Sequence, residues 1–196
     1  KPLSDVIVIP SDESKQLAVL RSKSAEMVIV DFKTNPPTMI DILPAPTDPV
    51  RVAVGGTNRL AVTGRWSRQG FLYEKVQQHW QHIATTRLPF APLALCFDHP
   101  GNQLLVADAF GGQLAVLQWD HPQRVQYQSI EGHNIRDISL SHNRQEVLIV
   151  HQLLHPHVET LTERIFWGNV INNFVRGIDW KELWEEGRSG TDSTPI

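Results

Sequence analysis

The sequence predicts an all-β protein assembled from one repeated unit of short antiparallel strands, and three observations support this prediction. First, four segments share an alternating apolar run, a polar turn and a second apolar run. Second, these segments begin at residues 6, 50, 93 and 135, so that successive units lie 44, 43 and 42 residues apart. Third, 13 prolines and 12 glycines are spread along the 196 residues, which favours many short elements over a few long helices.

Each unit supplies further strands after this first pair. A third strand is predicted over MVIVDF, GFLYEKV, QLAVLQW and NFVRGIDW, and a fourth over PTMIDILP, HWQHIATTRLP and RVQYQSIEG. Four strands in a unit of about 43 residues is the period of a β-propeller blade. The alternation fits this fold because a blade between two neighbours buries apolar side chains on both faces and keeps polar turns at its ends.

The units predict about four blades of four antiparallel strands, near residues 6–49, 50–92, 93–134 and 135–186, followed by a polar tail or linker over 187–196. The first strand of each unit is expected to lie innermost, over Val6–Ile9, Val50–Val54, Leu93–Phe97 and Ile135–Leu140. A short helix is expected over DWKELWEE, residues 179–186, because Asp179 can cap it and Leu183 lies within helical reach of Trp180.

The third unit, FDHPGNQLLVADAFGGQLAVLQWD, resembles the YVTN-type, WD40-like propeller repeat, in which a polar turn ending in Gly precedes a strand ending in Tyr-Val and then a Val-Ile-Asp strand. The matching turn is Asp98–Gly101, with weaker versions at residues 10–13 and 141–144, whereas the second unit departs from it with Gly55–Asn58. The resemblance covers residues 6 to about 180 and implies blades that belong to a ring of about seven.

An arc of four blades leaves the outer faces of its first and last blades uncovered, which a soluble protein seldom tolerates. Three arrangements would cover them: the chain is a fragment and the missing propeller blades lie elsewhere, two copies dimerise face to face, or four blades close alone. The polar end EEGRSGTDSTPI is interpreted as a loop leading into a missing blade.

Composition and motifs exclude several kinds of site. Cys96 is the only cysteine, which excludes an internal disulfide, a thiolate zinc site and haem attachment through C-x-x-C-H. The net charge of −3 and the lack of a long basic run predict that the protein does not bind nucleic acid. The sequence contains no run of eighteen apolar residues and so predicts no membrane span. The common hydrolase, nucleotide-binding and zinc-protease motifs are missing, so the sequence assigns no catalytic residue, metal or cofactor.

The loops between the second and third strands are expected on the face that carries the links between blades, because successive strands are antiparallel. We call this the connector face. It would collect Arg65, Trp66 and Arg68 from the second unit and Asp108 and Phe110 from the third. Loops on a rigid scaffold often carry function, and Trp and Arg are enriched at binding hot spots. The sequence therefore predicts a binding surface on the connector face.

The fourth unit carries an insertion over residues 151–173, since 24 positions separate Val150 from Phe174 where 8 separate Val106 from Leu114. Loops of this length are functional or disordered, and this one is too rich in large apolar residues for disorder. We expect a folded lid over the connector face, with binding residues His151, His155, His157 and Trp167. The histidines are otherwise interpreted as a polar surface loop.

The leading hypothesis is a non-catalytic scaffold that binds a partner protein through its connector face and insertion. The alternative is an accessory domain of a redox enzyme whose c-type cytochrome or peroxidase-like module lies outside this chain, so that a cytochrome c domain is the partner. A periplasmic or extracellular location is expected under either hypothesis.

Overall fold

The computed structural model describes residues 2–10, 15–155, 157–166, 170–183 and 194–195. In these residues the strands form four antiparallel sheets, and each sheet is a meander of four consecutive strands. Blade 1 consists of β1 (Leu3–Ile9), β2 (Gln16–Arg21), β3 (Glu26–Asp31) and β4 (Thr38–Pro44). Blade 2 consists of β5 (Pro49–Gly55), β6 (Arg59–Gly64), β7 (Gln69–Val76) and β8 (His79–Arg87).

Blade 3 consists of β9 (Pro92–Phe97), β10 (Gln103–Asp108), β11 (Gln113–Gln118) and β12 (His121–Ser129). Blade 4 consists of β13 (His133–Leu140), β14 (Glu146–Leu154), β15 (Ile171–Asp179) and β16 (Thr194–Pro195), with the short helix α1 (Thr162–Phe166) between β14 and β15. The predicted all-β architecture of four-stranded blades is confirmed.

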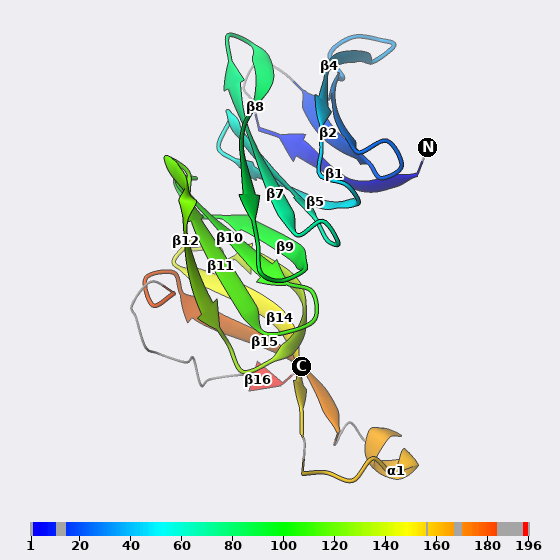
Figure 1. The fold of residues 1–196 in the computed structure, drawn as a ribbon, viewed down its shortest axis with the longest axis vertical. Helices are drawn as coiled ribbons and strands as arrows, with labels where there is room; N and C mark the ends of the chain where they lie inside the picture. The colour runs from blue at the N-terminus through cyan, green and yellow to red at the C-terminus, as the bar shows by residue number, and fades with distance from the viewer. Residues whose placement is uncertain (1, 11–14, 156, 167–169, 184–193, 196) are drawn as a thin grey trace.

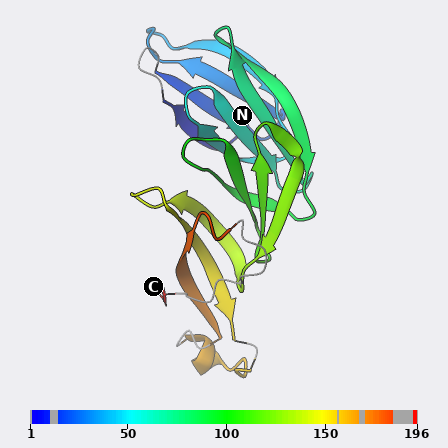
Figure 2. The same ribbon diagram turned by 90° about the vertical axis from the view of Figure 1, so that its left-hand side faces the viewer.

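The first strand of each blade contacts the first strand of the next, in the order β1, β5, β9 and β13. This arrangement confirms the prediction that these strands lie innermost. Figures 1 and 2 show the blades in a curved row, with blade 1 at one end and blade 4 at the other.

Each blade has a front face, toward the preceding blade, and a back face, toward the following one. The back face of blade 2 carries the cross-strand row Ala53, Ala61, Leu72 and Ala84. The front face of blade 3 carries the row Phe97, Leu104, Leu117 and Val125. These two rows belong to one buried apolar cluster. A Cβ at Gly55 would come within 2.8 Å of the Phe97 ring, so large front-face side chains here fill the space above small back-face residues.

A backbone hydrogen bond recurs in all four blades at the end of the third strand or directly after it. The N–H groups of Phe32, Lys75, Trp119 and Trp180 donate to the carbonyls of Lys15, Asn58, Asn102 and Gln145 respectively, at 2.8–2.9 Å. These four pairs therefore occupy equivalent positions in the repeat.

Two of these positions hold a tryptophan that contacts the preceding blade. Trp180 Nε1 donates to Gln103 Oε1 at 2.7 Å, and the Arg59 guanidinium lies 5.1 Å from the ring centroid of Trp119. Arg59 also donates to Asn102 Oδ1 at 2.7 Å. Arg59 and Gln103 are each the first residue of a second strand. The same pair of repeat positions thus links blade 2 to blade 3 and blade 3 to blade 4.

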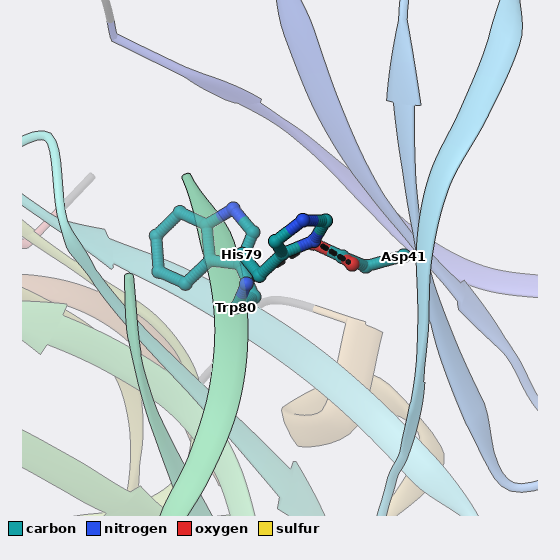
Figure 3. A network of polar contacts seen from close by, with 3 residues as sticks. All are labelled: Asp41, His79 and Trp80. Carbon is teal, nitrogen blue, oxygen red and sulfur yellow. Dashed lines mark hydrogen bonds and ion pairs between the residues drawn. The ribbon is translucent and has the colours of Figure 1, made fainter. Parts of the chain in front are cut away.

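The outer strands of blades 1 and 2 are joined through Asp41 on β4. Its carboxylate accepts a hydrogen bond from the Trp80 backbone N–H at 3.0 Å and lies 3.0 Å from His79 Nδ1 (Figure 3). Trp80 is buried between the two blades, and the Tyr73 hydroxyl donates to Pro44 O at 2.6 Å in the same cluster. Burial raises the pKa of Tyr73 well above its usual value, which keeps this hydroxyl a donor.

Only part of the segment expected as a helix and polar tail lies within the described residues. Residues 180–183 form a turn, in which Asp179 O accepts from Glu182 N–H and the Asp179 carboxylate accepts from Lys181 N–H. Asp179 therefore caps this turn as expected. Near the end of the chain, β16 pairs with β15 through Pro195 with Phe174 and Thr194 with Val175. Residues 184–193 lie outside the described residues.

Replacing Asp41 with Ala should lower the free energy of unfolding by about 1–3 kcal/mol, because the buried Trp80 N–H loses its acceptor. His79→Ala is the matched control and should cost less, since the His79 side chain is 68% exposed. Urea denaturation of the two variants measures the difference. Equal losses in both would show that the exposed ion pair, and not the backbone contact, joins the blades.

Candidate functional site

Trp66 and Phe110 come from neighbouring blades and stack on each other at the connector face. Their ring centroids are 5.7 Å apart with an interplanar angle of 26°. This separation lies in the range in which aromatic pairs attract. Trp66 nevertheless remains 69% exposed and Phe110 51% exposed. We call this pair the aromatic platform.

The loop that carries Trp66 is held by the link between blades 1 and 2. The Trp66 backbone N–H donates to the Asp48 carboxylate, and the Arg65 N–H donates to Asp48 O at 3.3 Å. The Ser67 hydroxyl donates to Thr47 O at 3.0 Å. Sequence reasoning did not single out Asp48. The Asp-Pro dipeptide at 48–49 indicates a turn, but it does not indicate which loop the Asp48 carboxylate contacts.

The loop that carries Phe110 is shaped by Asp108, which is only 7% exposed. The Asp108 carboxylate accepts from the N–H groups of Phe110, at 3.2 Å, and Gly111, at 2.9 Å. Phe110 O in turn accepts from the Asn134 N–H at 3.0 Å, which ties the loop to the start of blade 4. Asp108 was expected among the binding residues, and the structure places it beneath the platform as a support.

Two arginines lie in the same loop as Trp66. Arg65 is half-buried and Arg68 is exposed. The Arg68 guanidinium donates to Pro89 O at 3.3 Å, at the link between blades 2 and 3. The sequence-predicted residues Arg65, Trp66, Arg68 and Phe110 are thus all in loops of the connector face, and both arginines belong to the loop of Trp66.

The described part of the insertion, residues 151–155, 157–166 and 170–173, does not lie over this face as expected. β14 and β15 continue their ladder out to the pair Leu154 and Ile171, and this extended hairpin carries α1 outward. Figures 1 and 2 both show α1 projecting away from the blades, and residues 159–164 are exposed. Trp167 lies outside the described residues.

The three predicted histidines of the insertion are not brought to the platform. His151 is 1% exposed and stacks on Phe174 at 6.0 Å. His155 Nε2 lies 3.2 Å from the Asn172 amide nitrogen in the hairpin, and His157 is exposed. Among the described residues, no group of three or more His, Cys, Asp or Glu side chains is placed to hold a metal ion.

His151 is a packing residue because it continues the inward alternation of β14. Gly132 provides the space, since a Cβ there would come within 2.5 Å of His151 Nδ1. Burial lowers the pKa of His151, and the nearby Arg176 charge lowers it further. Sequence reasoning also missed Arg176, which is 1% exposed, because the apolar alternation of β15 does not reveal a buried guanidinium.

Solved structures similar to this one are propellers. The β-propeller domain of Cps50 (Swd1) from Myceliophteria thermophila is 10% identical with a TM-score of 0.63, over 76% of this chain and 50% of that one. The fold is that of a β-propeller. The periplasmic gluconolactonase PpgL of Pseudomonas aeruginosa is 15% identical with a TM-score of 0.60, over 79% of this chain and 50% of that one. Kuenenia stuttgartiensis hydrazine synthase is 14% identical with a TM-score of 0.53, over 86% and 60%.

The chain therefore spans 50–60% of the length of these three chains. Two of them are enzymes by name and one is a propeller domain, so the likeness concerns the fold alone. No protein-family model matches the sequence, and no curated protein does either. In the part of the chain that the structure describes, no helix is long and apolar enough to cross a membrane.

The stability of the protein should fall as the pH drops below about 6.5, the ordinary pKa of histidine. The unfolded chain then protonates His151 while the folded chain, where the pKa is lowered, keeps it neutral, so proton uptake favours unfolding. Thermal unfolding from pH 7.5 to pH 5 should show a smaller decrease in midpoint for His151→Phe than for the exposed control His157→Phe. An identical pH dependence in both variants would contradict the assignment.

Proposed function

We propose that the chain is a non-catalytic propeller scaffold that binds a partner protein through the aromatic platform. The observation that carries the proposal is the stacked pair Trp66 and Phe110, more than half exposed on the connector face. Single exposed aromatic side chains are common on protein surfaces. Two that meet from separate blades form a continuous apolar surface, which is the kind of patch that marks an interaction site.

The platform is preorganised, which favours binding. The Asp48 and Asp108 carboxylates hold the two loops through backbone N–H groups, so that both rings are presented by fixed backbone. A partner therefore needs to order little of this surface, and less of the contact energy is lost as entropy. Trp is also the residue type most enriched at binding hot spots.

The charge beside the platform defines the chemistry of the partner. Arg65 and Arg68 belong to the Trp66 loop, and the nearby Asp48 and Asp108 carboxylates accept hydrogen bonds from backbone N–H groups. A matching partner surface would present an aromatic or aliphatic side chain next to a carboxylate. The apolar side chain would pack on the rings, and the carboxylate would face the arginines.

A random peptide display library can be selected for binding to this protein and counter-selected against the Trp66→Ala/Phe110→Ala variant. The selected peptides should combine an aromatic residue with acidic residues. Trp66→Ala should weaken the selected peptides by about 2 kcal/mol or more, close to 30-fold in the dissociation constant, while the thermal midpoint stays unchanged. Fluorescence anisotropy measures the affinity.

The matched control is Tyr127→Ala, which removes another aromatic side chain, 54% exposed on β12 and outside the platform. It should leave the affinity unchanged. Equal affinity for Trp66→Ala and the parent protein, or a lowered thermal midpoint with unchanged affinity, would reject the recognition role.

A further inference from the structure

Two hollows lie between blades 2 and 3 at their outer rim, where the outer strands β8 and β12 contact each other (Figure 1). Each hollow has a volume of about 280 Å³. Tyr127 lines both of them, and its side chain remains more than half exposed. The two hollows therefore form one site with an aromatic ring between its halves, which we call the rim site.

Tyr127 belongs to the front face of blade 3. It ends a cross-strand row in which the other three members are buried in the apolar cluster between blades 2 and 3: Leu95, Val106, Ala115 and Tyr127. Tyr127 thus lies on the side of β12 that faces blade 2. It extends the apolar surface of this interface out to the rim.

Gly70 on β7 leaves open space in the opposite wall. It is the cross-strand partner of Thr86, which lines the first hollow. Gly70 is buried, yet a Cβ there would meet nothing within 4 Å. Its φ is not positive and its pairing with β6 and β8 is regular at this position, so neither a turn nor a bulge requires glycine. Glycine within a strand often marks a place where a ligand approaches closely.

Amide and hydroxyl side chains surround the aromatic ring. Gln123 lines the first hollow, and the cross-strand partners Gln113 and Ser129 line the second. The Thr86 hydroxyl donates to a backbone carbonyl at 3.0 Å, which leaves its oxygen able to accept from a ligand. Of the described residues that line the two hollows, none is acidic and only Arg87 is basic. The rim site therefore suits an uncharged ligand with many hydroxyl groups.

We infer that the rim site binds a carbohydrate, with one sugar unit in each hollow and the Tyr127 ring packed against their C–H groups. A pyranose ring has apolar C–H faces and hydroxyl groups around its edge, so it matches an aromatic side chain flanked by amides and hydroxyls. An apolar ligand would leave those polar groups unpaired. Together the two hollows have the size of a small-molecule pocket. This inference is independent of the proposed function, because the rim site includes neither Trp66 nor Phe110.

Titration calorimetry of the purified chain with maltose, cellobiose, lactose and chitobiose tests the inference. At least one of these disaccharides should bind saturably, with a dissociation constant of about 1 mM or lower. Tyr127→Ala should raise that constant at least about tenfold because it removes the ring, and Gly70→Val should do the same because its side chain fills the open space. Tyr127→Phe keeps the ring and should retain most of the affinity.

Trp66→Ala is the matched control, since it removes an exposed aromatic side chain outside the rim site, and it should leave the disaccharide affinity unchanged. Thermal midpoints establish that each variant is folded. The inference would be overturned if none of the four disaccharides bound saturably, or if Tyr127→Ala weakened binding no more than Trp66→Ala. A chain that binds platform peptides but no disaccharide would overturn the carbohydrate site and leave the proposed function intact.

Discussion

The packing of the front face of each blade onto the back face of the preceding blade is the constraint on which the rest of this structure depends. Within a strand such as β6, Leu60 and Val62 point to the front while Ala61, between them, points to the back. A one-residue change of register in blade 2 would exchange these sets and place large side chains against Phe97 and Leu104 of blade 3. The contact of Phe97 with Gly55 shows how closely the two kinds of face fit.

This packing also sets the position of the connector face. Because each blade lies on the back of the previous one, its second loop lies beside the equivalent loop of its neighbour. Trp66 and Phe110 are separated by 44 positions in the sequence, close to the repeat length, and they meet as a stacked pair. Asp48 and Asp108 then fix the two loops through backbone hydrogen bonds. The platform is therefore a consequence of the repeat together with two carboxylates.

The blades could be predicted from the sequence because strand alternation, turn residues and a fixed period all indicate the same unit. The placement of Trp66 and Phe110 on one face follows from the same pattern, but their stacking depends on the spacing between blades, which the sequence does not encode locally. The alternation of Val147 and Ile149 could have indicated that His151 faces the core. The uninterrupted apolar run ends at Val150, which is why the sequence pattern assigns His151 to the insertion.

The insertion was the largest error, and its cause is physical. The length and apolar content of a segment indicate that it is folded, but they do not indicate which surface it packs against. Here β14 and β15 extend their own ladder, which satisfies the backbone groups of the hairpin without contact to the connector face.

The close fit between blades is tested most directly by adding one methyl group where two faces touch. A Cβ at Gly55 would come within 2.8 Å of the Phe97 ring, whereas a Cβ at Gly70 would meet nothing within 4 Å. Gly55→Ala should therefore lower the free energy of unfolding by about 1–3 kcal/mol in urea denaturation, and Gly70→Ala should not. Equal stability of the two variants would contradict the account.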